Sequence, residues 1–442
     1  MSHFKMSYQD FIQSSFSPLV AVMCSPLVDQ ICKKNNLSFT EMIQPFCKLN
    51  SEASFRDPSG VMISIKNLRI NVSDVNSRPP QPTMARKFLN ESVSCHINDR
   101  TTTLDVGGIN LQVPVSVPWF EAWRDTFLQV QFPSDHEFTK HYVACMLVVS
   151  SRETSPLDMF VQMGSQLQQM QTISPAKLPK WFSPAVLRYH ILLHDNTEGD
   201  TPLAESLFET MKTTYGVNNV FFLSINSQQA STSETHMPDP WSQFLTRQLQ
   251  SQSIAVDGVM TNSWSSSTTS TVHGSCLTAD DVEKLRELVT CFCLSCLVPH
   301  VEQQIQHLTE LISNKKGMSR SFLSATKRWF GSKPGVPNTP TPTITYTTDS
   351  TELQLRRLGD LCFMFGAYSL AFTAYHAAKR DFNADGAWLY YAGALEMAAL
   401  SLFMQAADST KKAHDYAEES IMTYLNSCRY GYIQYASLLI LS

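Results

Sequence analysis

The sequence predicts an α+β protein of several domains, with an α/β domain over residues 1–250 and paired helices over residues 351–442. Three observations support this fold class. Strand-like and helix-like stretches alternate up to about residue 250, which is typical of α/β layer domains. A Ser/Thr-rich tract then interrupts the chain at 251–275, and almost every periodic stretch beyond it is helical. The chain has 442 residues, of which 43% are hydrophobic, so it can build packed cores and wholesale disorder is excluded.

Within residues 1–250, apolar residues at period two predict half-buried strands, and apolar residues at helical spacing predict helices. The predicted strands are Val61 to Ile70, Leu111 to Val117 and Val220 to Ile225, and the predicted helices are Pro118 to Gln131, Asp135 to Val149 and Leu203 to Tyr215. A further strand, LRYHILLHD, carries His190 and His194 at opposite ends of its apolar stretch. We interpret both histidines as solvated or hydrogen-bonded strand-end residues, with a catalytic role as the alternative.

Residues 251–275 (SQSIAVDGVMTNSWSSSTTSTVHGS) are expected to form a linker, because such a tract cannot bury enough apolar surface to offset its ordering entropy. A helical segment follows at 276–330. It opens with a cap and first-turn acids at Leu277 to Asp281 and stays periodic as far as Ile312. Four prolines within 331–350 preclude a helix there and predict a Pro/Thr-rich loop.

Residues 351–442 contain a helical repeat. The residues that stand at the offsets of the tetratricopeptide pattern are Leu358, Gly359, Gly366, Tyr368, Ala371 and Tyr375. A second pair that ends in glycine, Ala392-Gly393, follows 34 residues after Leu358-Gly359, and its first residue is small. We therefore predict the start of a tetratricopeptide-like α-solenoid, with a chance helical hairpin as the alternative, since a solenoid needs about three units to be stable alone.

Composition and termini narrow the class of protein. No run approaches ~18 consecutive apolar residues, so no membrane-spanning helix is expected. The N-terminus, MSHFKMSYQDFIQSSF, lacks the basic start and apolar core of a signal peptide, which predicts a cytosolic protein whose 11 cysteines are free thiols. The formal net charge of -5 argues against nucleic acid as a partner.

Two groups of residues imitate metal sites. The first is Cys291, Cys293, Cys296 and His300. We interpret these cysteines as buried structural thiols, because helical offsets of two and five residues place them on different faces; a zinc site is the alternative. The second group is His136, Glu137 and His141, in which the second histidine follows after five residues instead of the four of a zinc-protease helix. No phosphate loop, dinucleotide fingerprint or nucleophile elbow occurs, so we predict no enzyme and no cofactor.

A basic amphipathic helix is predicted at the end of the 276–330 segment. Between Glu310 and Asp349 there is no acidic residue, whereas six bases occur. Projected as a helix, the apolar side chains share one arc and the bases lie opposite, as in helices that lie on anionic bilayers. Near such a surface each base contributes about 1 kcal/mol. The predicted membrane-contact residues are Lys315, Lys316, Arg320, Phe322, Lys327, Arg328, Trp329 and Phe330. The alternative is that the apolar arc packs on neighbouring helices.

Long strings, in order along most of residues 10–427, carry a family resemblance. They are LSFTEMIQPF (Leu37 to Phe46), IKNLRI (Ile65 to Ile70), PWFEAWRDTFLQ (Pro118 to Gln129), DHEFTKHYVACMLVVSS (Asp135 to Ser151), PKWFSPAVLRYHILLHD (Pro179 to Asp195), PDPWSQFL (Pro238 to Leu245), KGMSRSFLSATKRWFG (Lys316 to Gly331) and GALEMAALSLFM (Gly393 to Met404). With these strings the chain resembles the family of subunit eight of the trafficking protein particle (TRAPP) complex, in its metazoan form. None of the strings is a catalytic signature.

The resemblance implies a non-catalytic subunit of the TRAPPIII form of this complex. It implies a GTPase-like α/β domain without a nucleotide site, then an α-solenoid. The complex it points to is a nucleotide-exchange factor for a Rab GTPase in ER-to-Golgi transport, which also serves autophagy. The implied partners are the small-subunit core, the other large TRAPPIII subunits, indirectly the Rab GTPase, and an anionic membrane contacted peripherally. The implied location is cytoplasmic, on early secretory membranes (ER-Golgi and cis-Golgi) and pre-autophagosomal membranes.

The sequence also departs from this family. Its members are more than twice as long, so we expect this chain to be a truncated N-terminal portion. The stretch from about Arg429 (RYGYIQYASLLILS) does not resemble the family. The alternative function is a purely structural tetratricopeptide-type scaffold without membrane contact.

Overall fold

The structure, a computed structural model, describes residues 7–76, 82–94, 101–106, 109–114, 123, 137–173, 186–228, 239–241, 244, 273–330, 344, 346–347, 349–405 and 410–428. The chain divides into two compact units. The first contains residues 1–75, 133–242 and 268–433, and the second contains residues 76–132, 243–267 and 434–442. We describe each unit by itself.

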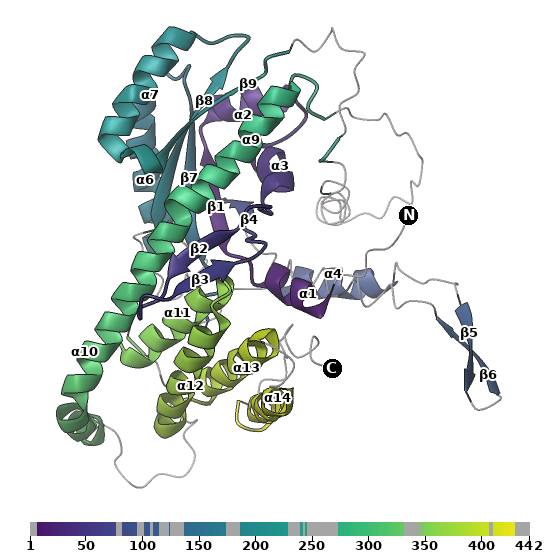
Figure 1. The fold of residues 1–442 in the computed structure, drawn as a ribbon, viewed down its shortest axis with the longest axis vertical. Helices are drawn as coiled ribbons and strands as arrows, with labels where there is room; N and C mark the ends of the chain where they lie inside the picture. Colours follow the sequence, from purple (N-terminus) through teal and green to yellow (C-terminus); the bar gives the residue numbers. More distant parts are fainter. Residues whose placement is uncertain are drawn as a thin grey trace. The chain divides into compact units, whose positions relative to one another are not determined.

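The first unit is built on a five-stranded parallel sheet of order β4-β1-β7-β8-β9 (Figure 1). Its strands are β1 (Leu19–Cys24), β4 (Asn71–Asp74), β7 (Tyr142–Ser150), β8 (Leu187–Asp195) and β9 (Val220–Ile225). Counted along the chain this order is 2-1-3-4-5, one of the two common arrangements of doubly wound sheets. The strand order reverses between β1 and β7, which defines the topological switch point.

The middle strands are buried on both faces. In β7 all residues from Ala144 to Val149 are fully buried, and its register pairs Ala144 with Leu187 through Ser150 with Leu193 of β8. A parallel strand covered on both faces reads as a continuous apolar run instead of an alternating one. The helix predicted over 135–149 is therefore wrong: the run YVACMLVVS is a central strand, which periodicity alone does not distinguish from a buried helix.

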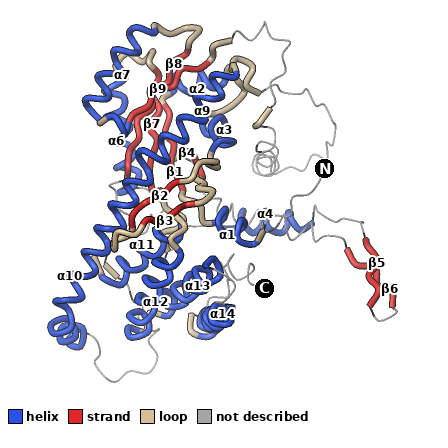
Figure 2. Tube along the Cα trace, in the orientation of Figure 1, coloured by secondary structure: helices blue, strands red, loops and turns tan. Residues whose placement is uncertain are grey.

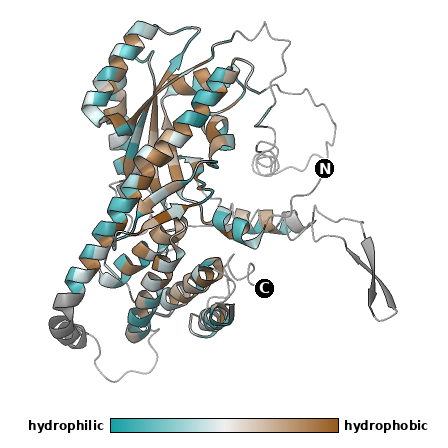
Figure 3. Cartoon of the chain, in the orientation of Figure 1, coloured by the Kyte–Doolittle hydropathy of each residue, from teal (hydrophilic) through white to brown (hydrophobic). Residues whose placement is uncertain are grey.

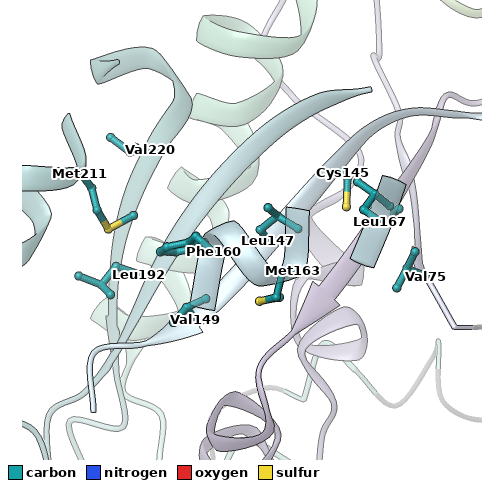
Figure 4. Packing of buried hydrophobic residues seen from close by; sticks show 11 residues of the cluster. Val75, Cys145, Leu147, Val149, Phe160, Met163, Leu167, Leu192, Met211 and Val220 are labelled. Carbon is teal, nitrogen blue, oxygen red and sulfur yellow. The ribbon is translucent and has the colours of Figure 1, made fainter. Parts of the chain in front are cut away.

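One face of the sheet is covered by α6 (Pro156–Ile173) and α7 (Thr201–Tyr215). Alternate β7 residues point into this layer, where they meet side chains spaced along one face of α6 (Figure 4). The buried cluster is Ala21, Val75, Cys145, Leu147, Val149, Phe160, Met163, Leu167, Leu192, Met211 and Val220. Each large apolar side chain buried in this way contributes about 1.5–3 kcal/mol. Helix α7 confirms the prediction over 203–215, whereas α6 and β1 were not predicted.

The opposite face carries α2 (Pro26–Lys33), α3 (Phe39–Ile43), the 3-10 turn Gln44–Phe46 and α9 (Ala279–Cys291). The Trp241 indole is buried and donates a 3.0 Å hydrogen bond to the Met42 carbonyl. The ring of Tyr189 on β8 meets the ring of Phe292 edge-on at 5.1 Å. Helices therefore cover both faces of the sheet, and Figure 3 shows the strands as its most apolar part.

A small hairpin and a short helix flank this sheet. The hairpin pairs β2 (Ala53–Arg56) with β3 (Met62–Ile65) antiparallel, and α1 spans Tyr8–Ser15. β3 confirms part of the strand predicted over 61–70, and the prediction is wrong beyond Ile65. β3 ends before Asn67, whose φ of 53° turns the chain toward β4, and the Val61 side chain is 60% exposed where a half-buried position was expected. The strand predicted over 220–225 is confirmed as β9.

A long helical stretch follows the sheet. It comprises α9, a π-helical turn at Phe292–Leu297 and α10 (Val298–Phe330). The predicted cap is confirmed as a capping box, in which Thr278 accepts from the Asp281 amide and Asp281 accepts from the Thr278 amide. By length and composition Ala279–Lys315 could cross a membrane, although no such helix was expected. Half of its most apolar window is buried inside the protein, which is how a core helix passes the same test.

The described residues of the first unit continue with four helices: α11 (Thr351–Met364), α12 (Tyr368–Asp385), α13 (Trp388–Gln405) and α14 (Thr410–Asn426). Each packs on the next, and Figure 2 draws helices joined by loops, and no strand, among the described residues of this part. Gly359 of α11 faces the Tyr375 ring of α12 so closely that a Cβ would lie 2.5 Å from it. This glycine of the predicted repeat pattern therefore lies where two paired helices approach each other closely.

In the second unit the structure describes α4 (Pro82–Ser94) and an antiparallel pair, β5 (Thr101–Val106) with β6 (Ile109–Pro114). β6 confirms the first part of the strand predicted over 111–117. Trp123 is helical, and the rest of the helix predicted over 118–131 lies outside the described residues. Most of the predicted linker at 251–275 and of the loop at 331–350 also lies outside them.

Candidate functional site

The topological switch point is where doubly wound sheets bind their ligands, and here it is closed. Only Ser25 separates the end of β1 from Pro26, the first residue of α2. Ser25 is 1% exposed, and its amide donates to the Val148 carbonyl at 2.9 Å. Pro26 has no amide hydrogen to donate. The start of α2 therefore lacks a glycine-rich loop, and the amides of Ser25, Val28 and Asp29 are already engaged within the chain.

Beside the switch point, the carboxyl ends of β8 and β9 hold a polar network. Asp195, the last residue of β8, is fully buried and accepts from the Lys34 ammonium at 2.6 Å and from the Asn226 amide at 3.2 Å. Lys34 also contacts Glu198 at 2.6 Å. Burial alone would raise the pKa of Asp195, but hydrogen bonds from Lys34, Thr197 and Asn226 hold it below its usual range. The charged carboxylate is thus the stable form.

The residues of this network use their hydrogen-bonding groups on one another. Thr197 donates to one Asp195 oxygen at 2.6 Å, while Lys34 and Asn226 occupy the other. Asn35 donates to Asn226 at 2.8 Å and accepts from the Cys276 amide at 2.9 Å. The polar groups of Asp195, Asn226 and Asn35 are consequently engaged within the chain, whereas the buried Ser25 hydroxyl has no hydrogen-bond partner among the described residues. The arrangement braces β8, β9 and α2 against each other.

The two strand histidines are likewise held in place. His194 is fully buried, with Nδ1 2.9 Å from the Ser151 hydroxyl and Nε2 3.1 Å from the Thr201 hydroxyl. His190 stacks on the Tyr215 ring at 3.9 Å, and burial lowers its pKa to about 4. The interpretation of both as hydrogen-bonded strand residues agrees with these contacts, since His190 Nδ1 also lies 3.4 Å from the Asn219 carbonyl.

The residues that imitate metal sites are dispersed in packed surroundings. Cys293 and Cys296 lie in the π-helical turn, and the Cys296 thiol donates to the Asn219 side chain at 3.3 Å. Burial raises the pKa of Cys296 to about 12, which disfavours the thiolate that binds metals. His141 is buried ahead of β7, and His136 lies outside the described residues. Among the described residues, no group of three or more histidines, cysteines or carboxylates could hold a metal ion.

The predicted membrane-contact residues lie at the far end of α10. The backbone of 316–330 is helical, as predicted. The side chains of Lys316, Arg320, Phe322, Lys327, Arg328, Trp329 and Phe330 lie outside the described part of the chain. Lys315 is described, and its ammonium donates to the Asp349 carbonyl. On the return of the chain, the Tyr346 hydroxyl donates to Asp385 at 3.0 Å. Hydrogen bonds of Lys315 and Tyr346 therefore fix the chain to the packed helices on both sides of residues 316–345.

A buried charged cluster joins the sheet to the helical array within the first unit. Arg356 and Asp360 of α11 form an ion pair at 2.8 Å and are both buried. Asp360 also accepts from the Tyr375 hydroxyl at 2.6 Å and from the Phe138 amide at 2.7 Å. Phe138 leads into β7, so the sheet and the array share this carboxylate. Sequence reasoning missed the cluster, because its parts lie far apart in the chain.

Comparison with known proteins decides the family. The family described as the ER-Golgi trafficking TRAPP I complex 85 kDa subunit (TRAPPC-Trs85) matches residues 12–442. The chain belongs to this family. The match of the TRAPPC-Trs85 family includes the stretch from Arg429, which we had expected to depart from it.

Named relatives within the TRAPPC-Trs85 family agree. Human trafficking protein particle complex subunit 8 is 36% identical over 97% of this chain and 35% of its own length. The Caenorhabditis elegans protein of the same name is 30% identical over 87% of this chain and 32% of its own length. The Schizosaccharomyces pombe transport protein particle subunit trs85-2 is 24% identical over 97% of this chain and 71% of its own. The chain thus spans about a third of the length of the human and nematode relatives.

Proposed function

We propose that this chain is a non-catalytic TRAPP subunit that docks on the small-subunit core and helps place a Rab nucleotide-exchange complex on membranes. The observation that carries the proposal is the family match over residues 12–442. The family description names TRAPP I; the assignment to the TRAPPIII form, with the other large subunits as partners, is part of the proposal. So are the roles in ER-to-Golgi transport and autophagy, and a cytoplasmic location on early secretory, Golgi and pre-autophagosomal membranes.

The two parts of the first unit suit a scaffold in this proposal. The parallel sheet acts as a GTPase-like domain without nucleotide function, which the closed start of α2 at Ser25 and Pro26 supports. The helices from α11 to α14 act as the start of a tetratricopeptide-like α-solenoid. The close contact of Gly359 with Tyr375 supports that role, because paired helices of such repeats meet at small residues.

Membrane placement is assigned to the end of α10. The bases and aromatic residues there are Lys315, Lys316, Arg320, Phe322, Lys327, Arg328, Trp329 and Phe330. No acidic residue accompanies them between Glu310 and Asp349. A helix of this composition binds anionic lipid reversibly, with the bases at the headgroups and the aromatic rings at the acyl boundary. The hydrogen bond from Lys315 to the Asp349 carbonyl keeps this helix attached to the start of α11.

Flotation with vesicles that contain phosphatidylserine tests this role. We expect the wild-type chain to float with the vesicles, less so at high salt. Reversing the charges of four bases should abolish flotation: Lys316, Arg320, Lys327 and Arg328. A matched control reverses four exposed bases elsewhere: Lys33, Arg56, Lys66 and Lys411. Equal flotation of both variants would contradict the membrane role of this helix.

The second candidate is a purely structural scaffold without membrane contact. The observation that favours it is the close packing of the helices, in which α13 is buried along most of its length. This alternative requires Trp329 and Phe322 to be buried against neighbouring helices. Acrylamide quenching of tryptophan fluorescence distinguishes the membrane helix from the scaffold. The contribution of Trp329 is the difference between the wild type and Trp329→Phe. Quenching of Trp329 like that of free tryptophan argues for the membrane helix, and protection argues for the scaffold.

A further inference from the structure

Positive charges and aromatic rings gather where α12 and α14 meet. The Lys379 ammonium lies 4.2 Å from the centroid of the Tyr416 ring, and the Lys412 ammonium lies 4.9 Å from that of Phe372. Lys412 also approaches the Tyr416 ring, at 5.9 Å. Because both lysines contact one ring, their charges lie within about 10 Å of each other.

A histidine completes this arrangement. His376 lies between the two helices, with Nδ1 2.9 Å from the Tyr416 hydroxyl. Burial lowers the pKa of His376, and the charges of Lys379, Arg380 and Lys412 lower it further. The histidine is therefore neutral near pH 7, and the local charge comes from the three bases. We call Lys379, Arg380 and Lys412, with the rings of Phe372, His376 and Tyr416, the α12–α14 basic cluster.

The lysines of this cluster have no carboxylate partner among the residues that the structure describes. Among the described residues, no carboxylate lies at ion-pair distance from Lys379 or Lys412. Glu419 acts on Lys379 from further away and accepts a hydrogen bond from Tyr391 instead. Lys212 shows the usual arrangement, since it lies 4.6 Å from the Phe208 ring and is paired with Glu209 at 2.7 Å. Lys379 and Lys412 contact aromatic rings in the same way, but no described carboxylate forms an ion pair with them.

We propose that the α12–α14 basic cluster is the docking site for an acidic peptide segment of a partner protein. Carboxylates of the segment would pair with Lys379 and Lys412, and the rings beneath would shield those pairs from water on one side, which strengthens charge-assisted hydrogen bonds. The net charge of the chain is -5, so the bases provide local complementarity in an acidic protein. This proposal goes beyond membrane placement and does not depend on it.

The surroundings of the cluster favour a peptide over a bilayer. A membrane site needs exposed apolar side chains that can enter the acyl region. The exposed residues of α12 are small or polar: Ser369, Thr373, Arg380, Asn383 and Ala384. On α14, Asp415 and Glu418 are exposed close to Lys412 in sequence and would repel an anionic lipid surface.

Fluorescence anisotropy with the full 442-residue chain tests the proposal. The probe is a fluorescein-labelled octapeptide with four glutamates around one phenylalanine, and its control carries glutamine in place of each glutamate. We expect the acidic peptide to bind, the control peptide not to bind, and the affinity to fall with salt. The double variant Lys379→Gln/Lys412→Gln should lose at least tenfold in affinity, because glutamine keeps part of the packing stem but no charge. Lys212→Gln, the matched lysine on a ring, should bind like the wild type.

The circular dichroism spectrum of each variant verifies that it is folded. Equal binding of the acidic peptide by wild type and double variant, or binding by neither, would overturn the proposal. A parallel arm uses phosphatidylserine vesicles. If the double variant loses vesicle binding while its peptide binding is unchanged, the cluster is a lipid site and the proposal is wrong.

Discussion

The Asp360 carboxylate of α11 accepts a 2.7 Å hydrogen bond from the backbone amide of Phe138, which lies just ahead of β7. This bond spans 222 residues of sequence and ties the parallel sheet to the helical array. The same carboxylate balances the buried charge of Arg356 at 2.8 Å. This buried ion pair therefore joins the parallel sheet to the helices α11 to α14.

Replacement of Asp360 should weaken the joint. Asp360→Asn removes the counter-charge of Arg356, whose Nη1 already has no hydrogen-bond partner among the described residues. An unpaired buried charge costs about 3–5 kcal/mol. Urea unfolding should show a loss of this order, and hydrogen exchange should speed up in a peptide spanning 137–150. Asp415→Asn, at an exposed position on α14, is the control and should change the free energy of unfolding by less than about 0.5 kcal/mol. A similar small loss for Asp360→Asn would refute the role of the joint.

Glu396 should make stability depend on pH. It is 7% exposed on α13 and accepts from the Tyr424 hydroxyl at 3.1 Å. Burial raises its pKa to about 8, Glu137 adds to the rise, and Tyr424 and Arg356 oppose it. Because the folded pKa exceeds the unfolded one, the stabilising contribution is complete below about pH 4 and is lost as the pH rises through about 8.

The variant Glu396→Gln removes this titration. We expect its melting temperature, relative to the wild type, to increase from about pH 5 to pH 8 and to level off above pH 8, by an amount equivalent to a few kcal/mol. Thermal unfolding followed by circular dichroism measures the difference. Parallel pH profiles for the two proteins would show that Glu396 is not buried as described.

Gly359 should tolerate no side chain. In Gly359→Ala the new Cβ would lie 2.5 Å from the ring of Tyr375, which is fully buried and cannot move aside. Overpacking of this kind costs about 1–3 kcal/mol, which a fall in melting temperature would reveal. Gly164→Ala is the matched control, since its Cβ would meet only the flexible end of Arg188 at 2.9 Å. Because alanine is the better helix former, Gly164→Ala should keep or gain stability, and an equal loss in both variants would show that the contact with Tyr375 does not set the effect.

Nucleotides should have no effect on this chain. Ser25 is buried and Pro26 lacks an amide hydrogen, so the start of α2 has no cradle for phosphate. We expect millimolar GTP with Mg²⁺ to leave the melting temperature unchanged. A ligand at 100 times its Kd would stabilise the fold by about 2.7 kcal/mol, so a clear rise would contradict the closed switch point.

Local signals in the sequence predicted part of the fold. The strand β9, the helix α7, the cap at Thr278 and the close approach at Gly359 each depend on a few neighbouring residues, and each is found. The helix predicted over 135–149 failed because a strand buried on both faces has no alternation. The strand predicted over 61–70 failed beyond Ile65 because a turn at Asn67 divides it.

Contacts between distant residues could not be predicted in this way. Lys34 and Asp195 are 161 residues apart, and their pairing requires knowing which strand ends meet at one edge of the sheet. An acid directly after the apolar run of β8 was a usable signal for Asp195, and so was Asn226 after β9. The α12–α14 basic cluster depends on the packing of two helices that the repeat pattern places only approximately.

The measurement that tests the account most directly is co-purification of the 442-residue chain with the small TRAPP subunits, followed by size-exclusion chromatography. We expect one stable complex that contains the chain and the small-subunit core. Small subunits that elute without the chain, while circular dichroism shows the chain to be folded, would contradict its role as a docking subunit.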